Sequence, residues 1–258
     1  MWLAEAHRRV AVLKRYIASD ILGWLADVVM LTGLILVASR GSTNALPAFV
    51  ALVFWQLSTK RVGGLAQTVR SERRYGTLPH IYLSGRGLAS LLVSRSIVAT
   101  LFDLIEVSCA AFPAAAVAMA LDVKMVPGPV SAWGFLTAMA VSVIGLTGLA
   151  FLLAAASLVF KQVAVFGLAL DYLMLIWSGT LDSLHLQGWL KAVSVYLPLT
   201  DSISLAKKVT DGAALADVLS QTELWRGIVV GAVYLVVGLV VFGAAERKAR
   251  LAGALFIQ

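Results

Sequence analysis

The sequence predicts an all-α integral membrane protein, and two observations support this prediction. Of the 258 residues, 60% are hydrophobic and only 14% are charged, and the mean hydropathy is +0.89. A soluble domain carries about 25% charged residues, so this chain is too apolar to be one. In addition, apolar stretches of about 20 residues recur along the chain, and about 20 helical residues cross a bilayer core about 30 Å thick.

Six stretches are long and apolar enough to be transmembrane helices. They lie at residues 21–38, 45–65, 88–121, 131–160, 163–181 and 225–244. The second is the weakest, because its C-terminal third contains the polar sequence QLSTKRVGG. The third is about ten residues longer than a span needs, and Pro113 within it should kink or break the helix. We expect residues 1–258 to form a single transmembrane domain.

Residues 1–19 precede the first span and predict an amphipathic helix. Apolar residues recur there at steps of three and four, which places them on one helical face. They are Leu3, Ala6, Val10, Leu13 and Ile17. Such a helix can lie in the inner membrane interface with Trp2 as an anchor, or it can pack on its own protein. The apolar stretch that follows is too long for a signal-peptide core, so we expect an uncleaved first span.

Basic residues are distributed unevenly between the two sides of the predicted membrane. With a cytoplasmic N-terminus, fifteen of the 21 Lys and Arg residues fall on the inner side and six on the outer side. This asymmetry predicts that both termini are cytoplasmic. It also accounts for the net charge of +7 without nucleic acid as a partner. We expect a multi-pass protein of the bacterial cytoplasmic membrane, in contact with membrane lipid.

The longest outer segment, residues 182–223, predicts re-entrant or interfacial helices. Its apolar patches, LHLQGWLKAVSVYLPL and ALADVL, are short, and polar residues with Gly188 and Pro198 interrupt them. A seventh span is therefore excluded. We expect this segment to cover the outer mouth of any path between the spans.

The segment TVRSERRYGTLPHIYLSGRG, residues 68–87, joins the second and third spans and is longer than a turn requires. Ser71 can cap a first short helix that Gly76 ends, and Thr77 and Pro79 can begin a second one. The charged side chains expected to be exposed on the first are Glu72, Arg73 and Arg74. Two such helices would form a rigid element suited to docking against a soluble partner.

Within this segment, SERRYGTLPHIYLSG resembles the E-x-x-x-G-T-L cytoplasmic signature of the type-2 ABC exporter permeases. The six-span layout, the amphipathic N-terminal helix and the outer re-entrant segment also match, so the resemblance covers nearly the whole chain. In that family the segment is the cytoplasmic coupling helix, which sits in a cleft of the ATP-binding subunit. Glu72, Gly76, Thr77 and Leu78 match the signature, whereas Pro79 stands where an acidic residue commonly follows the Leu.

The resemblance implies a permease subunit that is not itself catalytic and that binds no cofactor. It implies ATPase-coupling roles for Glu72, Arg73, Gly76, Thr77, Leu78 and Pro79. It further implies a second permease copy, in a homodimer or a heterodimer, and separate ATP-binding subunits that hold ATP and Mg. The sequence agrees with a separate ATPase, because it contains no G-x-x-x-x-G-K-[ST] phosphate-binding loop. His and Cys residues are scattered, so we expect no metal site.

Four acidic residues fall within predicted spans. They are Asp27, Asp103, Glu106 and Asp171. A charge at the bilayer centre costs on the order of 2.5 to 3.5 kcal/mol, so these side chains should face protein or water. They are candidates to line a translocation path or, alternatively, to form interhelical polar contacts. Three glycine pairs are candidates for close helix contacts within or between subunits: Gly63 with Gly64, Gly145 with Gly148, and Gly227 with Gly231.

We therefore expect the permease subunit of an ATP-binding cassette exporter that moves an amphipathic or hydrophobic substrate out of the cell. A drug, a small peptide or a lipid-linked molecule would fit. Three alternatives remain open. They are a polysaccharide or glycolipid exporter of the same family, an ion-coupled secondary carrier that uses the intramembrane acids, and a non-transporting membrane scaffold or sensor.

Overall fold

The computed structural model describes Glu5, His7, Ala11, Lys14 and residues 17–39, 43–77, 88–126, 131–160, 163–180 and 189–251. This part of the chain is 87% helix and contains no strand, which confirms the all-α prediction. Its helices are α2 (Ile17–Ala38), α3 (Leu46–Arg74), α5 (Leu88–Ala120), α6 (Ala132–Val159), α7 (Val163–Trp177), α8 (Trp189–Ser194), α9 (Thr200–Thr210), α10 (Leu215–Ser220) and α11 (Thr222–Leu251).

Four of these helices, α2, α5, α6 and α11, are long and apolar enough to cross a membrane. They support the prediction of a membrane protein. Two further helices coincide with predicted spans but fall short of this criterion. α3 falls short because polar residues from Gln56 onward lower its hydropathy, and α7 because it has only 15 residues.

The helix boundaries differ from the predicted spans at several points. α2 begins at Ile17, inside the segment assigned to the N-terminal amphipathic helix. α3 continues to Arg74, well beyond the predicted end at residue 65. Pro113 lies inside α5 without ending it, because the helix runs unbroken to Ala120. Of the two outcomes predicted for this proline, a kink or a break, the break does not occur.

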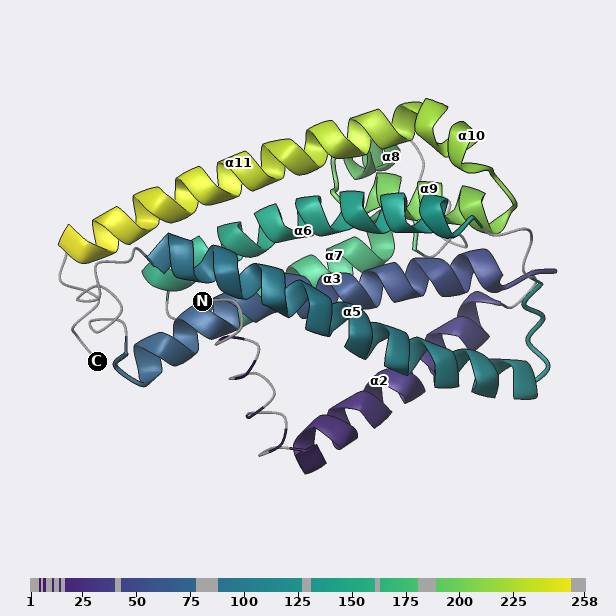
Figure 1. The fold of residues 1–258 in the computed structure, drawn as a ribbon, viewed down its shortest axis with the longest axis horizontal. Coiled ribbons are helices and arrows are strands. Elements are labelled where there is room, and N and C mark those ends of the chain that lie inside the picture. Colours follow the sequence, from purple (N-terminus) through teal and green to yellow (C-terminus); the bar gives the residue numbers. More distant parts are fainter. Residues whose placement is uncertain are drawn as a thin grey trace.

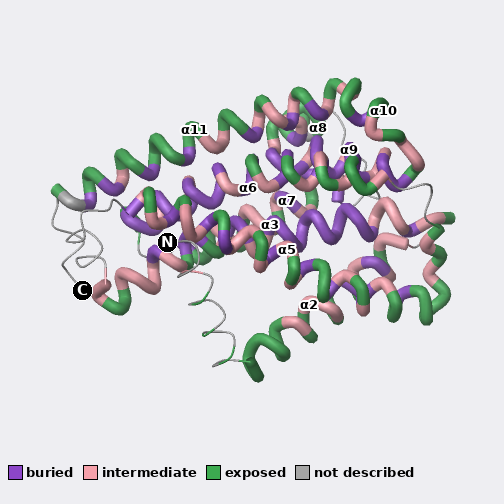
Figure 2. Tube along the Cα trace, viewed as in Figure 1, coloured by how far each residue is buried: buried purple, intermediate pink, exposed green. Residues whose placement is uncertain are grey.

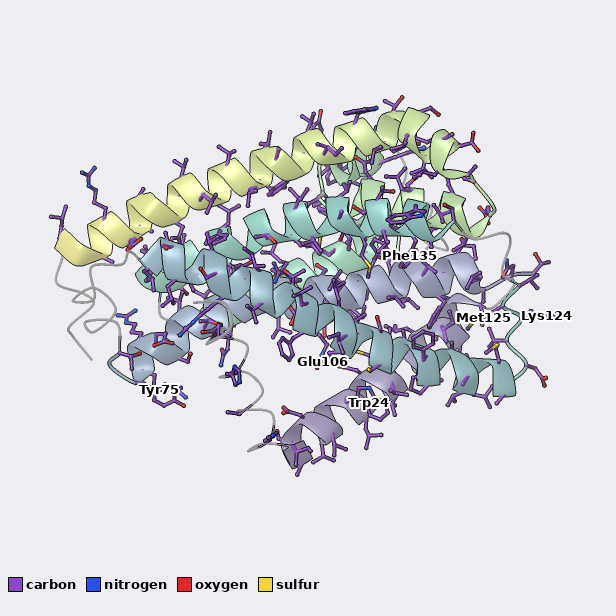
Figure 3. All side chains as sticks on the ribbon, in the orientation of Figure 1. Trp24, Tyr75, Glu106, Lys124, Met125 and Phe135 are labelled. Carbon is purple, nitrogen blue, oxygen red and sulfur yellow. The ribbon has the colours of Figure 1, made fainter. Side chains whose placement is uncertain are left out.

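The long helices lie side by side, and successive ones run in opposite directions (Figure 1). At one end, the backbone N–H of Ala45 before α3 donates to the carbonyl of Lys124 after α5, at 2.9 Å. Figure 3 places Lys124 and Met125 at this end and Tyr75 at the opposite end. We refer to them as the Lys124 end and the Tyr75 end.

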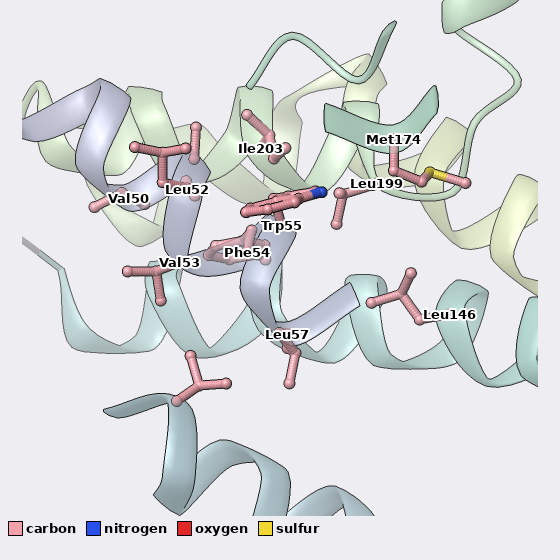
Figure 4. Close-up of a cluster of buried hydrophobic side chains, with 14 of the residues drawn as sticks. Val50, Leu52, Val53, Phe54, Trp55, Leu57, Leu146, Met174, Leu199 and Ile203 are labelled. Atoms are coloured by element: carbon pink, nitrogen blue, oxygen red, sulfur yellow. The ribbon is translucent and has the colours of Figure 1, made fainter. Parts of the chain in front are cut away.

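The hydrophobic core lies around α3, which is buried over most of its first half. Phe54 packs edge-to-face on Phe135 of α6, with ring centroids 5.6 Å apart. The indole N–H of Trp55 donates to the backbone carbonyl of Asp171 in α7, at 2.9 Å. Figure 4 shows side chains of α3 packed together with Met174 and with Ile203 of α9. The core thus joins helices that are far apart in the sequence.

Residues 189–220, in the described part of the chain after α7, contain three short helices, α8, α9 and α10. α9 packs against α3, α6 and α11 near the Lys124 end, and most of its residues are buried. Figure 2 shows the contrast between the buried α9 and the outer faces of α2 and α11, which are exposed. The exposed residues on those faces are mostly apolar, as expected for contact with lipid.

The glycine pairs serve different purposes. α6 and α11 approach so closely that a Cβ on Gly148 would overlap backbone atoms of α11. A Cβ on Gly231 would lie 3.3 Å from the backbone nitrogen of Gly145, so these two glycines face each other as well. Small residues permit this approach of two backbones. By contrast, Gly63 and Gly64 in α3 have open space where a Cβ would lie.

Candidate functional site

Two adjacent cationic residues near the middle of α3, Lys60 and Arg61, organise the polar interior of the protein. Neighbouring residues on a helix point about 100° apart, so the two side chains reach different helices. Lys60 reaches α2 and α5, and Arg61 reaches α5 and α6. We refer to them and their partners as the central polar network. Its members are Asp27, Lys60, Arg61, Ser96, Asp103, Glu106 and Thr147.

The ammonium group of Lys60 bridges two carboxylates from two helices. Its Nζ lies 2.7 Å from Oδ2 of Asp27 in α2 and 2.5 Å from Oε1 of Glu106 in α5. The side chains of Lys60 and Asp27 are about four-fifths buried, whereas that of Glu106 is 44% exposed. One cation therefore compensates two acids, and the bridge joins three helices.

The guanidinium of Arg61 is buried more deeply, with the residue only 3% exposed. It donates to the backbone carbonyl of Ser96 at 3.0 Å and to its hydroxyl at 2.9 Å. It also donates to the hydroxyl of Thr147 in α6 at 2.7 Å, and Oδ2 of Asp103 lies 3.6 Å from its NH1. A buried guanidinium needs such partners, because burial without them would be costly.

The predicted acidic residues thus separate into two groups. Asp27, Asp103 and Glu106 come together at the central polar network and pair with α3. Asp171 lies apart in α7, and its Oδ1 is buried without a hydrogen-bond partner in the described part of the chain. The sequence alone did not identify Lys60 as the shared partner of Asp27 and Glu106, or Arg61 as the partner of Asp103. The available signal was a pair of adjacent cations inside a predicted span.

A cavity of about 250 Å³ lies beside the network, between α3, α5 and the N-terminal Glu5. Its charged lining residues are Glu5, Lys60, Arg61, Arg95 and Asp103. A polar cavity of this size can hold several water molecules, because one water occupies about 30 Å³ in the liquid. The charged groups therefore lie next to a space that can be hydrated.

Arg95, which the sequence places on a face similar to that of Asp103 and Glu106, pairs with other acids. Its NH1 lies 2.5 Å from Oε1 of Glu72 near the end of α3, and its Nε lies 3.4 Å from Oε1 of Glu5. Arg95 thus links the end of α3 and Glu5 to α5. This group of charges lies between the network and the Tyr75 end.

The end of α3 is a capped turn whose hydrogen bonds follow the signature E-x-x-x-G-T. Gly76 has φ = 64°, a left-handed conformation that glycine adopts without strain. Its N–H donates to the carbonyl of Arg73 at 3.2 Å, and the N–H of Thr77 donates to that of Glu72 at 3.0 Å. This pair of bonds is the Schellman pattern. The Thr77 hydroxyl also donates to the Glu72 carboxylate.

Two predictions about this turn were wrong. Ser71 does not cap a separate short helix, because residues 71–74 are the last turn of α3 and its hydroxyl donates to the carbonyl of Thr68 at 2.8 Å. Glu72 and Arg73 are partly buried rather than exposed, since Glu72 faces α5. Gly76 does end the helix, as expected.

Two exposed residues at the end of α3 stand at variable positions of the signature E-x-x-x-G-T-L. Arg74 is exposed, and Tyr75 is 74% exposed at the tip of the turn. Figure 3 shows Tyr75 projecting from the end of α3. The remaining predicted coupling residues, Leu78 and Pro79, and the second short helix lie outside the described residues.

Within the described ranges, no group of three or more His, Cys, Asp or Glu residues is placed to hold a metal ion. A scan against protein-family models finds no match to this chain, and a search of the curated proteins finds no matching sequence.

Proposed function

We propose that this chain is the transmembrane permease subunit of an ATP-driven exporter and that it works with separate ATPase subunits. The observation that carries the proposal is the capped turn at the end of α3. There the residues that resemble the exporter signature, Glu72, Gly76 and Thr77, fix how the chain leaves the helix. The same turn presents Arg74 and Tyr75 outward for contact with a partner.

The capped turn has the properties that a mechanical contact needs. The Schellman bonds fix its shape, and the ion pair between Glu72 and Arg95 fixes its position on α5. A force applied to the exposed Tyr75 would therefore act on α3 and α5 together instead of bending a loop. In the proposed cycle, ATP binding closes the ATPase subunits, the 68–87 segment is displaced, and the helices rearrange to release substrate outward.

The proposal includes α3 and α7 as membrane spans beside α2, α5, α6 and α11. α3 has low hydropathy mainly because of its polar C-terminal half, yet Lys60 and Arg61 there are paired inside the protein. Paired charges that face protein are compatible with a span. α7 is about 22 Å long, so it would cross a locally thinned bilayer. The Tyr75 end would then be cytoplasmic, in agreement with its basic residues.

The bridge at Lys60 suits a membrane domain whose helices must shift. Because one ammonium has two carboxylate partners on two helices, α2 and α5 can move relative to α3 while Lys60 stays paired. The substrate would be amphipathic or hydrophobic, and a second copy of this chain would complete the path. The apolar surfaces of α2 and α11 are available for lipid and for that second copy.

A second candidate is an ion-coupled secondary carrier, and the central polar network favours it. Asp27 and Glu106 share one cation beside a cavity that can be hydrated, an arrangement in which a proton or a small cation could exchange. Such a carrier needs no ATPase partner. The two candidates therefore differ in what the native assembly contains.

Purification of the tagged chain from its host membrane tests the proposal. We expect an ATPase with a phosphate-binding loop to copurify. Y75A should lower its recovery several-fold, because the side chain at the tip of the turn is lost. Y196A is the matched control, since Tyr196 is 69% exposed and lies between α8 and α9, away from the capped turn in the sequence. Absence of any ATPase from the wild-type assembly, with transport driven by an ion gradient, would support the carrier instead.

A further inference from the structure

We infer that Glu246 is a positioning residue that transmits movement of the 68–87 segment to α11, because it holds the first residue of α5 from the end of α11. This inference rests on the proposed function, and it identifies which helices receive the movement. Three observations support this role of Glu246: its contact with Leu88, the apolar packing around that contact, and the tight packing of α11 on α6.

The carboxylate of Glu246 acts as the N-terminal cap of α5. Its Oε1 accepts a hydrogen bond from the backbone N–H of Leu88 at 3.1 Å, although the two residues are 158 positions apart in the sequence. The first N–H groups of a helix have no partner within the helix, and a carboxylate there also interacts favourably with the helix dipole. Glu246 is 5% exposed, so this cap is buried in the protein interior.

Apolar packing keeps Glu246 in place. Leu88 and Leu92 of α5 and Phe242 of α11 are fully buried in one cluster at the Tyr75 end. Phe242 contacts Phe151 of α6 edge-to-face, with ring centroids 5.8 Å apart. Phe242 lies one helical turn before Glu246, so the ring and the carboxylate share a face of α11. If α5 is displaced, it should therefore carry this face of α11 with it and not slide past it.

α11 can pass such a displacement to α6. A Cβ on Gly238 would overlap the backbone carbonyl of Gly148, so the two backbones are in direct contact. Thr147, the neighbour of Gly148, accepts a hydrogen bond from Arg61 at the central polar network. A continuous series of contacts thus runs from the start of α5 through α11 and α6 to the polar interior.

The other side of the 68–87 segment is held to the same helix. Glu72, in the last turn of α3, pairs with Arg95 of α5 at 2.5 Å. The end of α3 and the start of α5, which flank residues 78–87, are therefore held together through Arg95. We expect α5 to receive the displacement first and Glu246 to pass it to α11.

Hydrogen–deuterium exchange tests the cap on the purified full-length chain in lipid nanodiscs. E246A should speed exchange at the start of α5 by roughly five- to tenfold, which is the effect of losing an N-cap. E246Q keeps an acceptor oxygen and should change it much less. K248A, an exposed neighbour on α11, should leave it unchanged. Unaltered exchange at Leu88 in E246A would overturn the inference.

The complex with its copurified ATPase, trapped with ATP and orthovanadate, tests transmission. In the wild type, exchange should change both in residues 71–77 and in residues 238–251. With E246A the change should persist in residues 71–77 and disappear from residues 238–251, and E246Q should restore it. A response of residues 238–251 that survives in E246A overturns the inference and leaves the proposed function intact. A wild type without any response in residues 71–77 overturns both.

Discussion

Nζ of Lys60 in α3 lies 2.7 Å from Oδ2 of Asp27 in α2, and the same nitrogen lies 2.5 Å from Glu106 in α5. A single side chain thus joins α2, α3 and α5. The carboxylates outnumber the cation in this bridge, so the consequences of removing the cation and of removing one acid differ.

K60M should destabilise the protein more than D27N does. Without Lys60 two partly buried carboxylates face each other, which should cost about 3 kcal/mol, whereas D27N leaves Lys60 paired with Glu106 and should cost about 1 kcal/mol. Thermal unfolding in nanodiscs measures both. The triple variant K60M/D27N/E106Q is the control. It removes all three charges and should recover most of the stability. Equal melting temperatures for K60M and the wild type would contradict the bridge.

R61K should destabilise the protein although the charge is kept. Lysine has one terminal nitrogen where Arg61 uses two, so it cannot keep both the NH1 bond to the Ser96 carbonyl and the NH2 bonds to the Ser96 and Thr147 hydroxyls, and at least one buried hydrogen bond to a charged group is lost. The expected loss is about 2 kcal/mol in the free energy of unfolding. R74K at the exposed end of α3 is the matched control and should have no measurable effect. A tolerated R61K would show that Arg61 contributes charge alone.

G148A should be far more damaging than G63A. The new methyl group at position 148 would overlap the backbone of Tyr234 and Leu235, so α6 and α11 would have to separate. Overpacking of this kind costs about 1 to 3 kcal/mol and more where backbone must move. Gly63 has open space, and alanine there should stabilise the helix by about 0.5 to 1 kcal/mol. Yield and melting temperature of both variants check this prediction, and a stable G148A would contradict it.

The existence and order of the long helices could be predicted from the sequence because hydrophobicity and length alone determine them. Their ends could not. Ser71 has the same local signal whether it caps a helix or lies within one, and only the turn at Gly76 shows that α3 continues to Arg74. The second half of α3 has low hydropathy, so the predicted span ended too early. Charged residues lower the hydropathy of a stretch even where they are paired inside the folded protein.

The candidate site could be predicted only in part. Spacing shows that Asp103 and Glu106 share a face of one helix. It does not show that they reach Arg61 and Lys60 more than 40 residues away. Likewise, the sequence motif alone suggested that Glu72 faces a partner protein. Its pairing with Arg95 follows from how α3 packs against α5, and a short motif carries no information about that packing.

G76A should loosen the turn at the Tyr75 end, and G76N should preserve it. Alanine at φ = 64° costs about 1 to 2 kcal/mol, whereas asparagine adopts this conformation readily. Amide exchange in residues 72–77 should therefore rise about tenfold in G76A and little in G76N. Under the proposed function, ATPase recovery should fall in the same order. Equal recovery with both variants would show that the shape of the turn does not matter for assembly.

Swapping the charges of Glu72 and Arg95 by mutation should show whether Glu72 acts inside this chain or contacts the ATPase. Each single reversal, E72R or R95E, places like charges together and should lower both stability and ATPase recovery. Because Glu5 lies 3.4 Å from Arg95, the series is best made with E5Q in every variant.

The double reversal E72R/R95E restores an opposite pair, so the coupling energy in a double-mutant cycle should be about 1 to 3 kcal/mol. We expect it to recover ATPase binding as well, because the largely buried Glu72 holds the turn on α5 and Tyr75 makes the outward contact. Recovered stability without recovered ATPase binding would assign Glu72 to the contact itself.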